Sequence, residues 1–435
     1  MKRVLLCLPL VLLNAWTTTS AAASAQRSDT VAAENLPASP LNLRVNQLVD
    51  VLNEAMPVAD YFTQSFLTAV PPTQLKAITA SLHAQYGKAL NVRSIKRKSP
   101  SSATVEVELE RAIATIDITV ESVAPHKVAG LLATGFVVKG DDITKIEADF
   151  KALPGRAGYL VQKLNGSEMS RLNAEQQFAT GSTFKLYILA ELATQIEAGR
   201  RKWSDVVPLD ARAFSSSATQ GWPRGTPVTL QTLATWMISV SDNAATDELI
   251  RVLGRDAVEQ KLATIGHSAP DKALPLLTTV EVFALKSNPA LRARFEKATE
   301  AQQRDILDKE AAALGYDRID LSQLGSGPVA INSIEWFASP ADIALLMNHL
   351  RRIDSKTALD ILAVNKGIAP AAAAKWKYLG YKGGSEPGVI SMSFLAQSKA
   401  DEWYAISGSW NNSAAEVNND AFAALMGRLV DSVAH

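Results

Sequence analysis

Cysteine and an excess of either charge are what this sequence most clearly lacks. Only one cysteine, Cys7, occurs among its 435 residues, so we expect no internal disulfide and no thiolate metal site. The 44 basic and 44 acidic residues cancel, which removes the basic surplus that nucleic-acid-binding proteins usually carry. Hydrophobic residues make up 47% and charged residues 20%, as in folded globular domains. We therefore expect a folded protein that binds a small neutral or zwitterionic molecule and no nucleic acid.

Several motifs of cofactor and hydrolase chemistry are also missing. No P-loop, G-x-G-x-x-G or G-x-S-x-G sequence occurs, although these mark phosphate-binding loops and the nucleophile of many Ser-His-Asp hydrolases. We expect no cofactor and no metal. The five histidines lie far apart, without the spacing of a zinc site: His83, His126, His267, His349 and His435.

The first residues predict an export signal. Lys2 and Arg3 precede an apolar run from Val4 to Leu13, and the small residues that follow end in Ala23-Ser24-Ala25. These are the three parts of a secretory signal peptide. The run has ten residues, far fewer than the roughly 20 that span a bilayer, and no later run is longer. We expect residues 1–25 to be removed, leaving a periplasmic or secreted protein without a stable membrane span.

The length predicts more than one domain. Residues 26–42 are polar, contain Pro37 and Pro40, and are predicted to be a linker. A first α+β domain is expected over residues 43–150, and Pro154-Gly155 marks the boundary after it. Its expected helices lie within Leu43–Phe66 and Pro72–Tyr86, and its antiparallel strands are expected at Ala103–Leu109, Ala114–Val120 and Val128–Val138.

A second domain is expected over residues 155–435. Its first strand and its last three strands are predicted to form one sheet, with most helices between them in the chain. Strands are expected at Gly158–Leu164, Tyr378–Lys382, Val389–Ala396 and Trp403–Ser409, and helices at Thr183–Ala198, Leu230–Ser239, Ala244–Leu253, Pro340–Arg352 and Asp420–Val433.

The strongest chemical signal begins at Ser182, which precedes an apolar helix and is followed three residues later by Lys185. Near a helix N-terminus the serine is surrounded by free backbone N–H groups, and the lysine lies one turn further along the same face. A hydroxyl with an amine within reach is the arrangement of an activated nucleophile. Taken alone, the pair also fits a helix-capping serine with a surface lysine.

Two later motifs favour the nucleophile. Ser241-Asp242-Asn243 lies between two predicted helices, and Lys382-Gly383-Gly384 closes a predicted strand. Ser-x-x-Lys, Ser-Asp-Asn and a Lys-x-Gly strand, in this order, form the signature set of class A β-lactamases and penicillin-binding proteins. Residues 155–435 therefore resemble these proteins. The resemblance implies an α/β domain, an α-β-α sandwich around an antiparallel sheet.

The first domain shows a resemblance of topology only. Helices followed by a curved meander of strands are similar to the cone-shaped fold of cystatins and ketosteroid isomerases, and no motif accompanies this similarity. It implies a cone-like α+β domain before the β-lactamase-like domain. The whole chain resembles β-lactamase-related serine hydrolases that carry such an N-terminal domain.

The resemblance also implies roles in acylation. Ser182 would attack the substrate carbonyl, and Lys185, held partly neutral by its surroundings, would take the serine proton directly or through water. Ser241 would relay a proton to the leaving nitrogen. Asn243 would hold the neighbouring loop and contact Lys185 or substrate.

Substrate binding is expected along the strand that carries Lys382. Its charge would attract a substrate carboxylate, Gly384 and Ser385 would line the substrate site, and the N–H groups of Ser182 and Ser385 would form the oxyanion hole. Gly383 departs from the family pattern because a hydroxyl residue usually follows the lysine. Ser385 is a candidate for supplying the missing hydroxyl.

The base that activates water for deacylation is the least certain part of the site. The stretch between Ser241 and Pro340 is long, charged and predicted to be helical, and Glu281 is the candidate nearest in sequence. Composition and periodicity favour an exposed helical glutamate over a base at this position. The sequence predicts covalent acyl transfer, with a small acyl compound such as a β-lactam as substrate. Esterase or D-alanyl peptidase activity, or a slow-turnover penicillin-binding or sensor module, stays an alternative.

Overall fold

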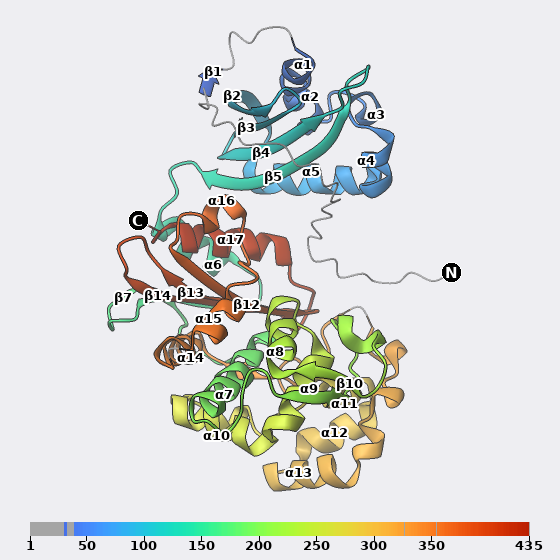
Figure 1. Cartoon of the computed structure of the whole chain (residues 1–435), viewed down its shortest axis with the longest axis vertical. Coiled ribbons are helices and arrows are strands. Elements are labelled where there is room, and N and C mark those ends of the chain that lie inside the picture. The colour runs from blue at the N-terminus through green and yellow to red at the C-terminus, as the bar shows by residue number, and fades with distance from the viewer. Residues whose placement is uncertain (1–29, 33–38, 326, 354, 435) are drawn as a thin grey trace.

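The computed structural model describes residues 30–32 and 39–434, apart from residues 326 and 354. The smaller N-terminal domain and the larger second domain are stacked along the long axis of the molecule (Figure 1). The predicted signal peptide, residues 1–25, lies outside the described residues. Among the residues that are described, no helix is long and apolar enough to cross a membrane.

The first domain is a five-stranded antiparallel sheet packed against helices, in the order β1-β2-β3-β4-β5. Alternate residues of β4 are buried, as the strand pattern predicts, and the α+β class is as expected. The strands are β1 (Thr30–Ala32), β2 (Ala89–Ser99), β3 (Ser102–Leu109), β4 (Ala112–Val120) and β5 (Val128–Val138), and the helices are α1 (Pro40–Asn46), α2 (Leu48–Leu52), α3 (Val58–Tyr61), α4 (Gln64–Ala69) and α5 (Pro72–Tyr86).

Two predictions for this domain need correction. The linker expected over residues 26–42 contains β1, whose Val31 pairs with Ile95 of β2, and α1 already begins at Pro40. The segment Leu43–Phe66, which has helical spacing of apolar residues, lies in four short helices with turns between them. Pro57 is the N-cap of α3, and a proline inside a helix would remove a backbone hydrogen bond.

The boundary between the domains also differs from the prediction. Helix α6 (Ile143–Ala152) lies almost entirely within the range expected for the first domain, but its buried Phe150 packs against Tyr159 and Phe422 of the second domain, with ring centroids 4.6 and 5.8 Å apart. Arg428 forms an ion pair with Asp141 just before this helix. The boundary therefore lies near Gly140 and not at Pro154-Gly155, because α6 completes the second core.

The second domain contains the predicted antiparallel sheet, in the order β12-β13-β14-β6-β7. One face packs against α6 and α17 and the other against α7 and α14, which gives three layers (Figure 1). The strands are β6 (Arg156–Lys163), β7 (Glu168–Leu172), β12 (Tyr378–Glu386), β13 (Val389–Gln397) and β14 (Trp403–Asn411), and the two helix layers contain α7 (Lys185–Glu197), α14 (Pro340–Arg352) and α17 (Asn419–Asp431).

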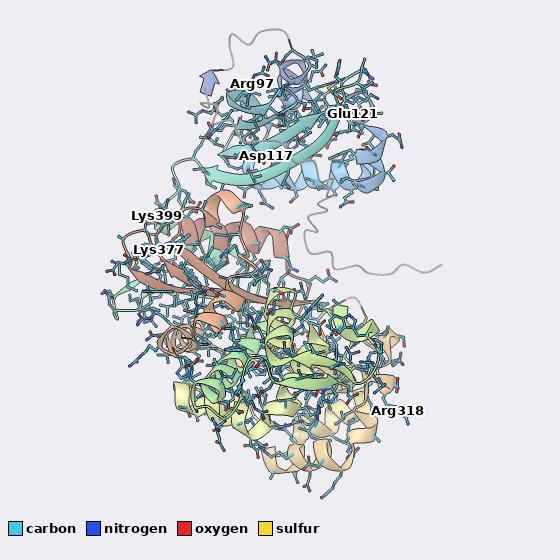
Figure 2. All side chains as sticks on the ribbon, viewed as in Figure 1. Arg97, Asp117, Glu121, Arg318, Lys377 and Lys399 are labelled. Carbon is cyan, nitrogen blue, oxygen red and sulfur yellow. The ribbon has the colours of Figure 1, made fainter. Side chains whose placement is uncertain are left out.

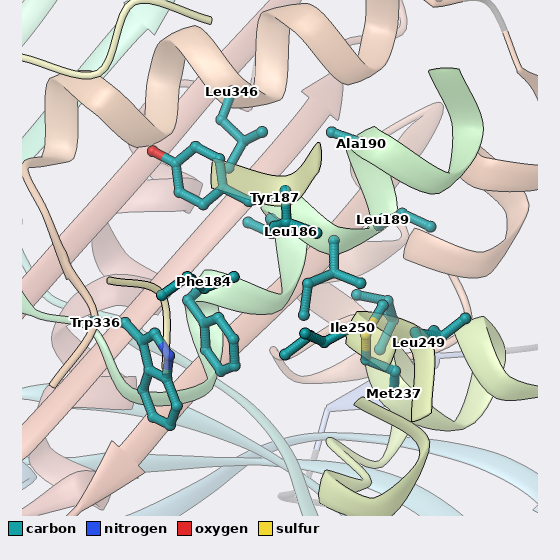
Figure 3. Packing of buried hydrophobic residues seen from close by; sticks show 14 of the residues in the cluster. Phe184, Leu186, Tyr187, Leu189, Ala190, Met237, Leu249, Ile250, Trp336 and Leu346 are labelled. Carbon is teal, nitrogen blue, oxygen red and sulfur yellow. The ribbon is translucent and has the colours of Figure 1, made fainter. Parts of the chain in front are cut away.

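Helix α7 lies in the centre of this domain. Leu186, Leu189 and Ala190 are fully buried and lie beside residues of α8 and α9 (Figure 3). A helix that is apolar on all sides belongs in the interior, and each buried leucine contributes roughly 1.5–3 kcal/mol. The helix that carries the predicted nucleophile at its start is therefore held rigidly. Its neighbours are α8 (Leu230–Ser239), α9 (Asn243–Leu253) and α10 (Arg255–Ile265).

The long stretch before Pro340 is helical, as predicted. Its three helices lie at the end of the molecule farthest from the first domain (Figure 1). Charged side chains such as Arg318, Lys377 and Lys399 are exposed on the second domain (Figure 2). The inserted helices are α11 (Thr279–Ser287), α12 (Pro289–Lys297) and α13 (Glu300–Lys309), and α15 (Lys356–Leu362) and α16 (Pro370–Ala373) follow α14.

Candidate active site

Ser182 lies in one turn of 3₁₀ helix, Gly181–Phe184, which leads directly into α7. Phe184 stacks on Trp336 with ring centroids 3.9 Å apart. The N–H and the Oγ1 of Thr180 both donate to the Trp336 carbonyl at 2.9 Å. Gly181 has a φ of +48°, a conformation that glycine adopts without steric cost. The turn is thus fixed from both sides, and Ser182 itself stays half-buried.

Lys185 is fully buried, and its Nζ has three polar contacts. It donates to the Ser241 carbonyl at 2.7 Å and to Asn243 Oδ1 at 2.6 Å, and Ser241 Oγ lies 3.2 Å away. Burial lowers the pKa of Lys185 to about 7, although the charges of Asp247 and Asp242 act in the opposite direction. A large fraction of the amine is therefore neutral near pH 7, as a proton acceptor requires.

The residues of the Ser-Asp-Asn motif have different contacts, some of which fix the local structure and some of which reach Lys185. Asp242 is the N-cap of α9: its Oδ1 accepts from the Ala245 N–H, and its Oδ2 accepts from the Thr219 N–H, both at 2.8 Å. Asn243 Nδ2 donates to the Phe214 carbonyl at 3.0 Å, which leaves Oδ1 for Lys185. Ser241 has a φ of +61°, an uncommon conformation for serine that is often found at functional sites.

Lys382 reaches Ser241 from the sheet. Its buried Nζ lies 3.0 Å from Ser241 Oγ and 2.5 Å from the Gly383 carbonyl. Burial and the nearby charge of Lys185 hold the pKa of Lys382 well below its ordinary value. One hydroxyl oxygen therefore lies within hydrogen-bonding distance of two amines that are both poor cations. This arrangement can pass a proton from one amine to the other.

Gly384 and Ser385 lie against the turn that carries Ser182. A Cβ atom on Gly384 would be 2.2 Å from the Thr180 carbonyl oxygen and 2.3 Å from the Ser182 nitrogen, so only glycine fits. A Cβ atom on Gly181 would be 3.1 Å from the Ser385 nitrogen. The structure therefore brings together the two chain segments whose N–H groups were predicted to form the oxyanion hole.

The unusual Gly383 has a structural reason that the sequence did not show. A Cβ atom at this position would be 2.1 Å from the hydroxyl oxygen of Tyr381. The Tyr381 ring packs on Phe394 with centroids 5.0 Å apart, and burial raises its pKa to about 12, so the hydroxyl keeps its proton. Tyr381 fills the space of the absent side chain and supplies a hydroxyl there, whereas Ser385 is exposed. The position of Tyr381, one residue before Lys382, was the only signal in the sequence for this role.

The hydrogen bonds and the ion pair of Glu281 lie at the start of α11 and do not connect it to Ser182. Its Oε2 accepts from the Thr278 N–H at 2.7 Å in a capping box at the start of α11, and its Oε1 pairs with Arg255 at 2.6 Å. These contacts use both oxygens in fixing a helix end. Glu281 therefore acts in the structure as a capping carboxylate.

Sequence reasoning missed the role of Asp247. This buried residue of α9 accepts from the Thr279 N–H and Oγ1 at 2.7 and 2.8 Å and from the Val280 N–H at 3.0 Å. Burial raises its pKa to about 7, although these hydrogen bonds act against the rise. Asp247 thus attaches the start of α11 to the helix that begins with Asn243, beside Lys185.

The sequence and the fold are similar to those of known proteins. The model of the β-lactamase enzyme family matches residues 141–365. VEB-1 β-lactamase of Pseudomonas aeruginosa is 26% identical over 132 residues, which are 29% of this chain and 44% of that protein. The chain thus matches less than half the length of this relative.

Solved structures were compared as well. The β-lactamase from Sphaerobacter thermophilus is 20% identical and covers 67% of this chain and 95% of its own, with a TM-score of 0.47. The β-lactamase from Chitinophaga pinensis is 17% identical and covers 66% and 96%, with a TM-score of 0.45. The family model, however, matches more than half of the chain, and its range contains Ser182, Lys185 and the Ser-Asp-Asn motif. On that match, the chain belongs to the β-lactamase enzyme family.

Proposed function

We propose that this protein is an exported serine hydrolase that forms an acyl-enzyme on Ser182 and hydrolyses β-lactams. The observation that carries the proposal is the buried amine of Lys185, which begins the helix that follows Ser182. Its pKa of about 7 and its contact with Ser241 Oγ make it a base at neutral pH. A lysine with a purely structural role would not need a lowered pKa.

In the proposed acylation, Lys185 takes the proton of Ser182 as Ser182 Oγ bonds to the carbonyl carbon. The carbonyl electron pair moves onto its oxygen, which accepts from the N–H groups of Ser182 and Ser385. When the pair returns, the carbon–nitrogen bond breaks. Ser241 gives its proton to the leaving nitrogen and recovers one from Lys185, 3.2 Å away.

The donors around Lys382 support a substrate that carries a carboxylate. The Lys382 amine and the protonated Tyr381 hydroxyl lie on the strand beside Gly383, and the negative charge of a carboxylate would strengthen the hydrogen bonds that it accepts from them. β-Lactams have such a carboxylate next to the bond that is cleaved, and so do D-alanyl peptides. Simple esters do not, which makes esterase activity the less favoured alternative.

Intact mass spectrometry tests the proposal. The full mature chain is incubated with a penicillin, a cephalosporin and a simple acyl ester, and its mass is followed over time. We expect an adduct with the β-lactams that forms and then decays, and no adduct on Ser182→Ala. An adduct on Ser182→Ala would contradict the nucleophile, and labelling by the ester alone would contradict the substrate class.

Export is tested separately. We propose that residues 1–25 are removed, so the protein recovered from the periplasm or medium of an expressing bacterium should begin at Gln26. An intact Met1, or retention in the cytoplasm, would contradict export while leaving the acyl-enzyme proposal intact.

A further inference from the structure

A second group of buried charges lies at the C-terminal end of β12, and acylation does not use it. Lys286 of α11 donates to Glu335 Oε1 at 2.7 Å and to Glu386 Oε1 at 2.5 Å. The Lys286 and Glu335 side chains are 2% and 1% exposed, whereas Glu386 is 15% exposed. Of the three groups, Glu386 is the one that a water molecule reaches most easily.

The composition of this cluster is unusual for a purely structural contact. It holds two carboxyl groups but a single ammonium. A buried ion pair adds little stability compared with apolar residues of similar size, and here a second carboxyl group is also removed from water. The cluster is therefore a costly way to attach α11 to the sheet, which points to a chemical use of its most accessible member.

Strand geometry places Glu386 on the reacting side of the sheet. Alternate residues of a strand share a face, so Glu386 faces the same way as Gly384 and Lys382. Lys382 contacts Ser241, and Gly384 lies against the nitrogen of Ser182. Glu386 lies two residues further along, about 7 Å at the usual rise of a strand. Glu386 thus lies on the same strand face as the residues beside Ser182, two residues beyond the last of them.

The neighbours of Glu386 belong to the same wall of the site. Helix α11 begins at the Thr279 contact with Asp247, whose charge acts on Lys185, and reaches Lys286 near its other end. Glu335 directly precedes Trp336, whose carbonyl holds Thr180. The cluster is therefore joined through the backbone to the turn of Ser182 on one side and to the lysine base on the other.

We propose that Glu386 is the base that activates water for hydrolysis of the acyl-enzyme, with Lys286 and Glu335 as positioning residues. This inference rests on the proposed function and supplies the step for which Glu281 is unsuited.

The proposed step is balanced as follows. The water oxygen bonds to the acyl carbon while one water proton passes to a carboxylate oxygen of Glu386. The carbonyl electron pair moves onto its oxygen and then returns, which breaks the bond between the carbon and Ser182 Oγ. Lys185, which is neutral after acylation, first takes up a proton from solvent, and Ser182 Oγ takes this proton as the bond breaks. Glu386 then releases its proton to solvent, so Lys185 and Glu386 return to the states in which they began.

The electrostatics of the cluster agree with this role. Burial and the adjacent Glu335 raise the pKa of Glu386 well above its ordinary value, whereas the Lys286 charge acts against the rise. Although burial opposes it, the two carboxyl groups raise the pKa of Lys286, which stays a cation. A carboxylate with a raised pKa is a stronger base for water, and Lys286 favours its ionised form.

The test separates acylation from deacylation. Glu386→Gln preserves size and leaves Lys286 paired with Glu335, so the fold should persist. Rapid-quench intact mass should show adduct formation on Ser182 within about threefold of wild type. Adduct decay should be slower by roughly 10² to 10⁴, the usual contribution of one general base. Glu281→Gln is the matched control, and its adduct should decay at the wild-type rate.

Two further variants keep the inference testable. Glu386→Asp withdraws the carboxylate by one carbon and should restore part of the decay rate. Lys286→Met should slow decay while leaving adduct formation unchanged, as expected of a positioning residue. If Glu386→Gln is unstable, Glu386→Asp carries the test alone: slower decay at an unchanged rate of adduct formation supports the inference.

Several results would overturn it. An unchanged decay rate in Glu386→Gln, or a loss of acylation equal to the loss of deacylation, refutes the assignment and leaves Ser182 as nucleophile. A wild-type adduct that persists overnight refutes the presence of any working base. Absence of an adduct on wild type with every β-lactam refutes the proposed function itself, and the inference with it.

Discussion

The protonation of Lys185 controls how the rate of acylation should depend on pH. Burial lowers the pKa of this lysine from 10.5 to about 7. Each unit of pKa corresponds to about 1.4 kcal/mol, so burying this amine disfavours its cation by about 5 kcal/mol. At pH 7 about half of the amine is then neutral, against about 0.03% at the ordinary pKa. The lowered pKa alone thus supplies more than a thousandfold more base.

The sign of the pH dependence follows directly. Only the neutral amine accepts the Ser182 proton, so acylation should rise about tenfold from pH 5 to pH 6, bend near pH 7, and become level above pH 8. The measurement is the rate of adduct formation at low β-lactam concentration by rapid-quench mass spectrometry. The pKa of Asp247 is also about 7, so the pH midpoint of the acylation rate reflects the titration of Lys185 and Asp247 together.

Asp247→Asn distinguishes this explanation from others. The Asp247 charge raises the pKa of Lys185, so its removal should move the midpoint to lower pH without lowering the rate at high pH. Asparagine cannot accept from all three donors at the start of α11, so we also expect lower thermal stability. A rate that stays constant between pH 5 and pH 9, or a midpoint that moves upward, would refute the role of Lys185 as base.

Three further predictions concern other parts of the structure. Gly384→Ala should reduce acylation at least 10²-fold, the usual cost of a lost oxyanion donor, because its Cβ would collide with the turn of Ser182; an unchanged rate of adduct formation would contradict the packing. Tyr381→Phe should raise KM about tenfold for substrates with a carboxylate and leave KM for simple esters unchanged, as steady-state kinetics would show. A chain that starts at Gly140 should fold. A chain that starts at Lys151 lacks the buried α6 residues, whose loss should lower the free energy of unfolding by about 4–8 kcal/mol, and it should aggregate. Equal melting temperatures of both chains by circular dichroism would contradict the revised boundary.

Helices with strong local patterns were predictable from the sequence. Leu230–Ser239 and Pro340–Arg352 have the bounds that their apolar spacing and capping residues indicate. The strand at Tyr378 was predicted to end near Lys382 but continues to Glu386. Glycines have low strand propensity, and here pairing decides: Gly383 lies opposite Met392 of β13. Such long-range pairing leaves no signal in the strand itself.

The catalytic motifs were predictable for a different reason. Ser182 and Lys185 are one helical turn apart, so their proximity follows from local geometry, and the ordered motifs added Ser241 and Lys382. The cluster of Lys286, Glu335 and Glu386 joins positions 49 and 100 residues apart and has no spacing to recognise. Glu281 is the candidate base nearest to Ser241 in sequence, but the packing of α11 decides which residues meet in space.

The two departures from the family pattern therefore have related consequences. The long insert provides α11, and α11 brings Lys286 beneath the end of β12. The missing hydroxyl after Lys382 leaves room for the Tyr381 ring. Asp242 and Asp247, the acidic residues that act on Lys185, are held by the backbone donors of α9 and α11. In our proposal, acylation and deacylation accordingly use different positions on one strand, with lysine chemistry at Lys382 in its middle and carboxylate chemistry at Glu386 at its end. Exchange of Glu386 should thus affect only the second half of the reaction.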